Sequence, residues 1–136
     1  NNRRGGRQIA LQALYWEASD AGDADGAVRD LADRFDLSPK IRDFALRLVS
    51  AVGEHRDRLD ELISTTATHW HQDRMARLDS LILRLALAEI LYCDDIPVPV
   101  SIDEAIELAK TYSTDQSYSF INGILDAIVR QQGLSL

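Results

Sequence analysis

Residues 96–128 read IPVPVSIDEAIELAKTYSTDQSYSFINGILDAI, and this stretch predicts two successive helices. Its two prolines favour an extended backbone over residues 96–100, because proline biases the preceding residue away from the helical region. Ser101 and Glu104 match a capping box, which predicts that the first helix starts at Ser101. A polar loop over residues 113–119 then separates it from the second helix, which opens with Phe-Ile-Asn-Gly. Two adjacent amphipathic helices favour an all-α fold.

The rest of the chain shows the same helical pattern. Apolar residues recur at steps of three and four, and no long stretch alternates with period two. Ser38 is expected to cap a helix that has Pro39 in its first turn, and Asp79 to cap the very apolar helix that follows it. The predicted segments are 4–18, 28–35, 41–63 with a bend at Gly53, 74–78, 80–93, 101–112 and 120–132. The sequence thus predicts one all-α domain of about seven helical segments over residues 1–136.

The composition fits a single domain with a hydrophobic core. The chain has 136 residues, of which 46% are hydrophobic. No apolar run approaches the roughly 18 residues of a membrane span, and no stretch reads as a secretion signal. Cys93 is the only cysteine, so no internal disulfide can form and we expect a small core side chain there. We therefore predict a cytoplasmic protein that does not enter a membrane.

The charge is unevenly distributed along the chain. The net charge is −7, yet residues 1–16 carry Arg3, Arg4 and Arg7 and no acidic residue. The remaining residues carry 12 basic and 22 acidic side chains. A basic arm on an acidic body favours a small, localised contact with a polyanion. From charge alone, three solvated arginines near a terminus are the simpler interpretation.

No set of residues indicates catalysis, a cofactor or a metal site. His69 and His71 lie two positions apart without a cysteine at metal-ligand spacing, whereas a structural zinc site takes four ligands. The pair Gly5-Gly6 does not follow a strand, so it is no phosphate-binding loop. In a chain of this length, these observations favour a binding module over an enzyme.

One face of the first helix favours RNA. Residues at steps of three and four bring together Arg4, Gln8, Leu11, Gln12 and Tyr15, with Arg7 on the same turn. Guanidinium, carboxamide and phenol groups can hold phosphates and can stack or hydrogen-bond with unpaired bases. Tyr118 and Phe120 would add stacking surface if the last helix begins beside the first. The alternative is that Tyr15 and Phe120 are core aromatics and the glutamines are solvated, and the pattern alone favours a core position for Phe120.

The order of several motifs resembles the NusB family of transcription antitermination factors. The motifs are RRGGRQIALQALY (3–15), LDELI (59–63), Trp70 to Arg74, Ile82-Leu83-Arg84 with Glu89, IPVPVSIDEAIELAK (96–110) and FINGILD (120–126). The resemblance covers nearly the whole chain, and it implies an all-α protein built as two packed helical bundles.

The resemblance also implies a function and a set of contact residues. Family members bind the single-stranded boxA segment of ribosomal RNA leaders together with NusE, a small-subunit ribosomal protein, in antitermination complexes on RNA polymerase. By position, the implied RNA-binding residues are Arg3, Arg4, Arg7, Gln12, Tyr15, Phe120 and Asn122, to which the helical face adds Gln8. The implied contacts with NusE are Asp79, Gln116 and Tyr118.

Some positions depart from the family pattern. Gly5-Gly6 replaces helix-favouring residues, which predicts that the arm frays until RNA binds. Gln116 stands where an acid is frequent, and Ser119 where a basic residue is frequent. Two other functions stay open: the NusB-like N-terminal domain of a ribosomal RNA cytosine methyltransferase, and a helical bundle for protein interaction. Self-association as a homodimer also stays open.

Overall fold

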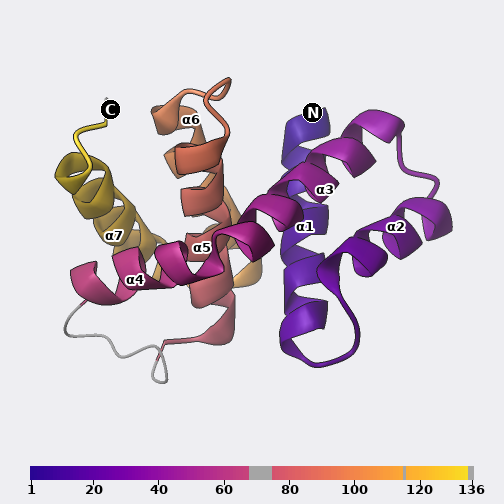
Figure 1. Ribbon diagram of the computed structural model, residues 1–136, viewed down its shortest axis with the longest axis horizontal. Coiled ribbons are helices and arrows are strands. Elements are labelled where there is room, and N and C mark those ends of the chain that lie inside the picture. Colours follow the sequence, from indigo (N-terminus) through magenta and orange to yellow (C-terminus); the bar gives the residue numbers. More distant parts are fainter. Residues whose placement is uncertain (68–74, 115, 135–136) are drawn as a thin grey trace. The chain divides into compact units, whose positions relative to one another are not determined.

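The computed structural model describes residues 1–67, 75–114 and 116–134, and all regular structure in these ranges is helical (Figure 1). The helices are α1 (Asn2–Ala18), α2 (Ala24–Arg34), α3 (Pro39–Glu54), α4 (Arg56–Thr66), α5 (Arg77–Tyr92), α6 (Val98–Tyr112) and α7 (Ser117–Gln131). The predicted all-α fold with about seven helices is therefore confirmed. No helix in the described ranges has both the length and the apolar character needed to cross a membrane.

The chain divides into two compact units, Asn1–Glu54 with α1 to α3 and His55–Leu136 with α4 to α7. The prediction of one domain over residues 1–136 stays a prediction. The motif from Trp70 to Arg74 and the histidines at 69 and 71 lie outside the described residues, as does the start of the segment predicted over 74–78.

In the first unit, α1 packs against α2 and α3 (Figure 1). Small and branched apolar side chains form its core, among them Ala10, Ala13, Leu14, Val28, Ala45 and Leu48. Glu17 near the end of α1 accepts a hydrogen bond from the backbone N–H of Ala24 at 2.9 Å, which ties α1 to the first residue of α2. Ser38 caps α3 as predicted, because its hydroxyl accepts from the N–H of Ile41 at 3.3 Å.

In the second unit, α5 packs against α4, α6 and α7. After Ser80, two charged residues interrupt the apolar sequence of α5, and both have partners. Arg84 donates to Asp60 of α4 at 2.7 Å, and the buried carboxylate of Glu89 accepts from the Ser101 hydroxyl of α6 at 2.9 Å. A central helix that is apolar nearly all round thus keeps its polar groups satisfied. Cys93 is buried at the end of this helix, as expected.

The long helix predicted over residues 41–63 was wrong, because the chain breaks it into α3 and α4. The residue between them, His55, has φ −112° and ψ 20°. Its ring stacks on Tyr92 with centroids 3.6 Å apart and planes 9° apart. A glycine at position 53 weakens the helix just before the break, and the ring stack holds the first residue after α3 outside helical geometry.

The predicted extended segment over residues 96–100 was also wrong at its C-terminal end. Helix α6 begins at Val98, with Pro97 at its N-cap and Pro99 in the first turn, where a missing N–H costs nothing. Ser101 therefore lies inside the helix and does not cap it. Its hydroxyl is used by Glu89, so a tertiary hydrogen bond replaces the predicted local one.

Asp79 does not cap α5, which starts two residues earlier at Arg77. Its carboxylate instead accepts hydrogen bonds from the hydroxyls of Ser113 at 2.6 Å and Ser117 at 2.9 Å. Because Ser117 is the first residue of α7, that helix begins inside the loop predicted over residues 113–119. Asp79 thus fixes the connection from α6 to α7.

The start of α1 is helical in spite of Gly5-Gly6. The side chain of Asn1 caps the helix by accepting from the N–H groups of Arg3 at 2.9 Å and Arg4 at 3.3 Å. A Cβ at Gly6 would lie only 2.8 Å from the Phe44 ring, so the missing side chain lets α3 approach α1 closely. The expectation of a frayed arm is replaced by a capped helix that packs against α3.

Candidate nucleic-acid interface

The N-terminal half of α1 presents positive charge at the surface. Arg3 and Arg4 are both exposed, and no acidic residue lies in the first turn of the helix. Because they are consecutive, their side chains leave the backbone about 100° apart around the helix axis. The first turn can therefore offer cations in two directions at once.

Phe44 of α3 organises two of the three predicted arginines. The guanidinium carbons of Arg3 and Arg7 lie 5.4 Å and 5.5 Å from the centroid of its ring, within cation–π range. Arg7 is only 3% exposed and Phe44 8%, whereas Arg3 is exposed. Arg7 is thus part of the packing beneath the surface, and its predicted contact with RNA stays a prediction. Phe44 was not among the site residues predicted from the sequence.

The polar face of α1 continues from Arg4 toward the C-terminal end of the helix. Gln8 is half-buried and Gln12 is exposed. Tyr15 is 45% exposed, so it is not a core aromatic, whereas Leu11 on the same face is buried at 1%. Three residue types that can hydrogen-bond or stack with unpaired bases therefore follow the arginines along one helix.

Trp16, which the sequence analysis missed, is 52% exposed beside Tyr15. Its indole nitrogen lies close to Gly22, where a Cβ would be only 3.0 Å away. A hollow of about 430 Å³ lies between α1 and α2, and Gln12, Trp16 and Asp30 are among its lining residues. The signal for Trp16 was present, because it stands four positions after Gln12 and so shares its face.

Phe120 and Asn122 lie in the first two turns of α7, in the second unit. Phe120 is half-buried and Asn122 is exposed. The core interpretation of Phe120 is thus only partly correct. Their participation in the same RNA site as α1 stays a prediction.

Two of the three residues predicted to contact a partner lie at the surface. Gln116 is exposed at the N-cap of α7 and makes no side-chain cap, and Tyr118 is 40% exposed with the Lys110 ammonium 5.3 Å from its ring centroid. Asp79 is 7% exposed and holds Ser113 and Ser117. Its direct contact with a partner stays a prediction, whereas its structural role in shaping the α6–α7 connection is evident.

Within the described ranges, no group of three His, Cys, Asp or Glu side chains could hold a metal ion. The groups that α1 and α3 do bring together are guanidinium, ammonium and carboxamide groups, with the carboxylate of Asp43 beside them. Their chemistry is that of binding phosphates and bases.

The comparisons with known proteins agree with this chemistry. The NusB family model matches residues 4–130. The transcription antitermination protein NusB of Desulfosudis oleivorans is 41% identical over 135 residues, which cover 97% of this chain and 88% of that protein. Its counterpart in Geobacter sulfurreducens is 45% identical over 127 residues, covering 93% of this chain and 92% of that protein.

Solved structures show the same fold. NusB of T. maritima superposes with a TM-score of 0.87 at 36% identity, covering 95% of this chain and 91% of that one. The NusB chain in a crystal structure of antitermination factors NusB and NusE in complex with dsRNA has a TM-score of 0.84 at 23% identity, covering 96% and 97%. Because the NusB family model matches residues 4–130 and a NusB relative is 41% identical over 97% of the chain, the chain belongs to the NusB family.

Proposed function

We propose that this chain is a transcription antitermination factor that acts without catalysis in the cytoplasm. It binds the boxA segment of ribosomal RNA leaders together with the ribosomal protein NusE, in antitermination complexes on RNA polymerase. The observation that carries the proposal is the exposed pair Arg3 and Arg4 on a capped first turn, with the polar face of α1 continuing behind them. The names of the relatives, and the NusB–NusE–RNA complex among the solved structures, support it.

The start of α1 and the rest of its polar face have different roles in RNA binding. Arg3 and Arg4 hold backbone phosphates, which supplies affinity that depends on salt but not on sequence. Gln8, Gln12 and Tyr15 face unpaired bases, where hydrogen bonds and stacking distinguish one sequence from another. The acidic remainder of the chain repels RNA elsewhere, so binding concentrates on this helix.

The proposal is tested by fluorescence anisotropy with three labelled RNAs: single-stranded boxA, a scrambled single strand and a duplex. Each is titrated with and without NusE over a salt series from 50 to 200 mM. We expect selective binding of single-stranded boxA that tightens when NusE is added. Preference for the duplex would contradict the single-strand assignment, and folded protein without any selectivity would favour the methyltransferase-domain or protein-interaction alternatives.

The arm is tested with Arg3→Ala/Arg4→Ala. If each arginine contacts one phosphate, the slope of log K against log salt should flatten by about 1.4, because each contact to a single strand contributes about 0.7. Arg29→Ala/Arg130→Ala is the control, since it also removes two positive charges. Hydrogen bonds to Asp25 and Asp126 raise the pKa of these two arginines, so both are charged at any assay pH. An equal change in both double variants would refute the arm as the RNA-binding element.

A further inference from the structure

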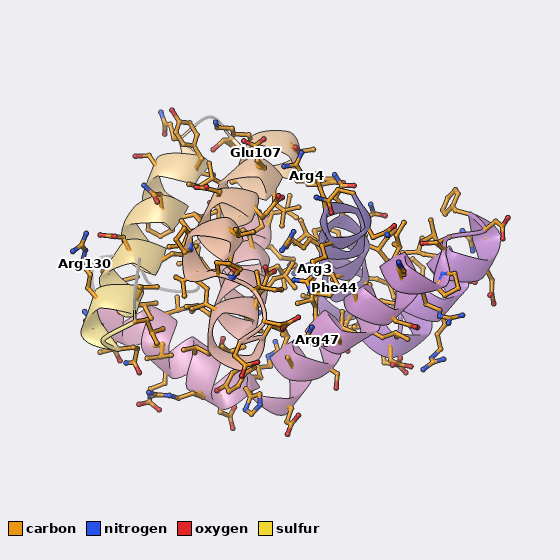
Figure 2. All side chains as sticks on the ribbon, turned by 90° about the horizontal axis from the view of Figure 1, so that it is seen from above. Arg3, Arg4, Phe44, Arg47, Glu107 and Arg130 are labelled. Carbon is orange, nitrogen blue, oxygen red and sulfur yellow. The ribbon has the colours of Figure 1, made fainter. Side chains whose placement is uncertain are left out.

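A second basic surface lies where the start of α1 meets α3 (Figure 2). It is an open hollow of about 510 Å³, which we call the α1–α3 hollow. Its lining residues are Asn1, Asn2, Arg3, Lys40, Asp43, Phe44 and Arg47. Neither the family resemblance nor the sequence pattern assigns a role to its α3 residues.

The α3 side of the hollow is built by helical spacing. Positions 40, 43, 44 and 47 follow one another at steps of three, one and three, so they form one face of α3. Lys40 and Arg47 are exposed at the two ends of this face, and the buried ring of Phe44 lies between them. The backbone positions of these two basic residues are thus about 10 Å apart along the axis, from the rise of 1.5 Å per residue.

Arg3 adds a third cation from α1, over the face of Phe44. The ring stabilises the guanidinium on one side, and its planar N–H groups can bind phosphate oxygens in a bidentate manner. The backbone at the start of α1 is not the donor, because the Asn1 side chain already accepts from the N–H groups of residues 3 and 4. We therefore assign the donor role in the hollow to the basic side chains.

Charge in the hollow favours an anion. Three of the lining residues are basic and one, Asp43, is acidic. The acid pairs with the neighbouring Arg42 at 3.0 Å, which offsets its charge. This local excess of positive charge contrasts with the net charge of −7 for the whole chain.

We propose that the α1–α3 hollow binds a backbone phosphate of the RNA, so that the RNA contact extends from α1 onto α3 through Lys40 and Arg47. The inference rests on the proposed function. The non-bridging oxygens of this phosphate accept from Lys40 and Arg47, and it is the neighbour of the phosphate that Arg3 holds. RNA is favoured over free phosphate because the hollow shares Arg3 with the arm.

The test is Lys40→Ala/Arg47→Ala in the anisotropy assay with boxA and scrambled RNA. We expect weaker binding of both RNAs by the same factor, since a phosphate contact carries no sequence information. Loss of one phosphate contact flattens the log–log slope by about 0.7, so the affinity ratio of wild type to variant should shrink about 2.6-fold between 50 and 200 mM salt. Both side chains are exposed, and circular dichroism verifies that the variant folds.

Two further variants sharpen the result. Arg58→Ala/Arg130→Ala removes the same charge from two residues that do not line the hollow, and it should leave the slope unchanged. Asp43→Asn removes the one acid that lines the hollow and should tighten binding of both RNAs. A K40A/R47A slope equal to that of wild type would overturn the inference, as would an equal effect of the control variant. In either case wild-type selectivity for boxA would still stand, whereas absence of RNA binding by the wild type would refute the proposed function itself.

Discussion

Replacing one or the other of two adjacent glycines in α1 by alanine should have different effects on stability. A Cβ at Gly6 would lie 2.8 Å from Cδ2 of Phe44 and 3.3 Å from the carbonyl oxygen of Ile41. A Cβ at Gly5 would lie no closer than 3.4 Å to its nearest neighbour, the terminal methyl group of Ile41. Gly5→Ala and Gly6→Ala are therefore a matched pair that makes the same chemical change on the same helix.

The magnitudes follow from two terms. Alanine is favoured over glycine by about 1 kcal/mol inside a helix, and both variants gain this. Only Gly6→Ala also overpacks, which typically costs about 1–3 kcal/mol, because Phe44 is buried and a backbone oxygen stands behind it. We expect Gly5→Ala to stabilise by about 1 kcal/mol and Gly6→Ala to be about 1–3 kcal/mol less stable than Gly5→Ala.

Urea unfolding followed by circular dichroism measures both variants against wild type, and RNA anisotropy supplies a second readout. Because Phe44 supports Arg3 and Arg7, its displacement in Gly6→Ala should also weaken RNA binding, whereas Gly5→Ala should retain it. Equal stability of the two variants would refute the close packing of α1 on α3. A stability difference without a change in RNA affinity would show that Phe44 does not position the arginines.

Two polar contacts of α5 give further predictions. Ser101→Ala removes a hydrogen bond to the buried Glu89 carboxylate and should lower the free energy of unfolding, measured by thermal unfolding, by about 1–3 kcal/mol. A loss below about 0.5 kcal/mol would mean that other donors suffice for this carboxylate. Arg84→Met removes the ion pair with Asp60, in which the two side chains are 2.7 Å apart and 13% and 29% exposed. It should lower the free energy of unfolding by more than about 1 kcal/mol. Arg130→Ala removes a solvent-exposed pair and should lower the thermal stability far less than Arg84→Met, so equal losses in the two arginine variants would show that burial does not matter here.

The sequence predicted the fold where the signal is local. Apolar residues at steps of three and four indicated the helices, and Ser38 was recognised as a cap by its position before a proline. The same reasoning misassigned Ser101 and Asp79, which also have the chemistry of caps. Their partners, Glu89 and Ser117, lie 12 and 38 residues away, and spacing cannot reveal such pairs.

The division of the predicted long helix has the same explanation. Gly53 was noticed as a weak point, but a single glycine usually costs a helix about 1 kcal/mol and does not break it. The break occurs at His55, whose ring stacks on that of Tyr92, the last residue of α5. A ring stack between residues 37 positions apart leaves no periodic trace in the sequence.

The candidate site was predicted as far as one helix could show it. Charge and spacing along residues 3–15 were enough to select Arg3, Arg4 and Tyr15 as candidate RNA contacts, and all three side chains are exposed. Lys40 and Arg47 were missed because they join Arg3 only through tertiary packing. A basic pair at i and i+7 with an aromatic between them was the available signal, but it gains meaning only when the facing helix is known.

Salt dependence decides how an acidic protein can bind RNA at a small basic surface. Residues 1–54 carry eight basic and nine acidic side chains, whereas residues 55–136 carry seven and thirteen. At about 0.1 M salt the Debye length is about 10 Å, so acidic groups farther from a phosphate than this are screened, while cations in direct contact are not. At about 0.01 M the length grows to about 30 Å, and repulsion from the whole chain then opposes the arm. Two variants of equal net charge experience the same overall repulsion from the acidic chain. A difference between their salt slopes from 50 to 200 mM therefore reports the direct phosphate contacts that only one of them has lost.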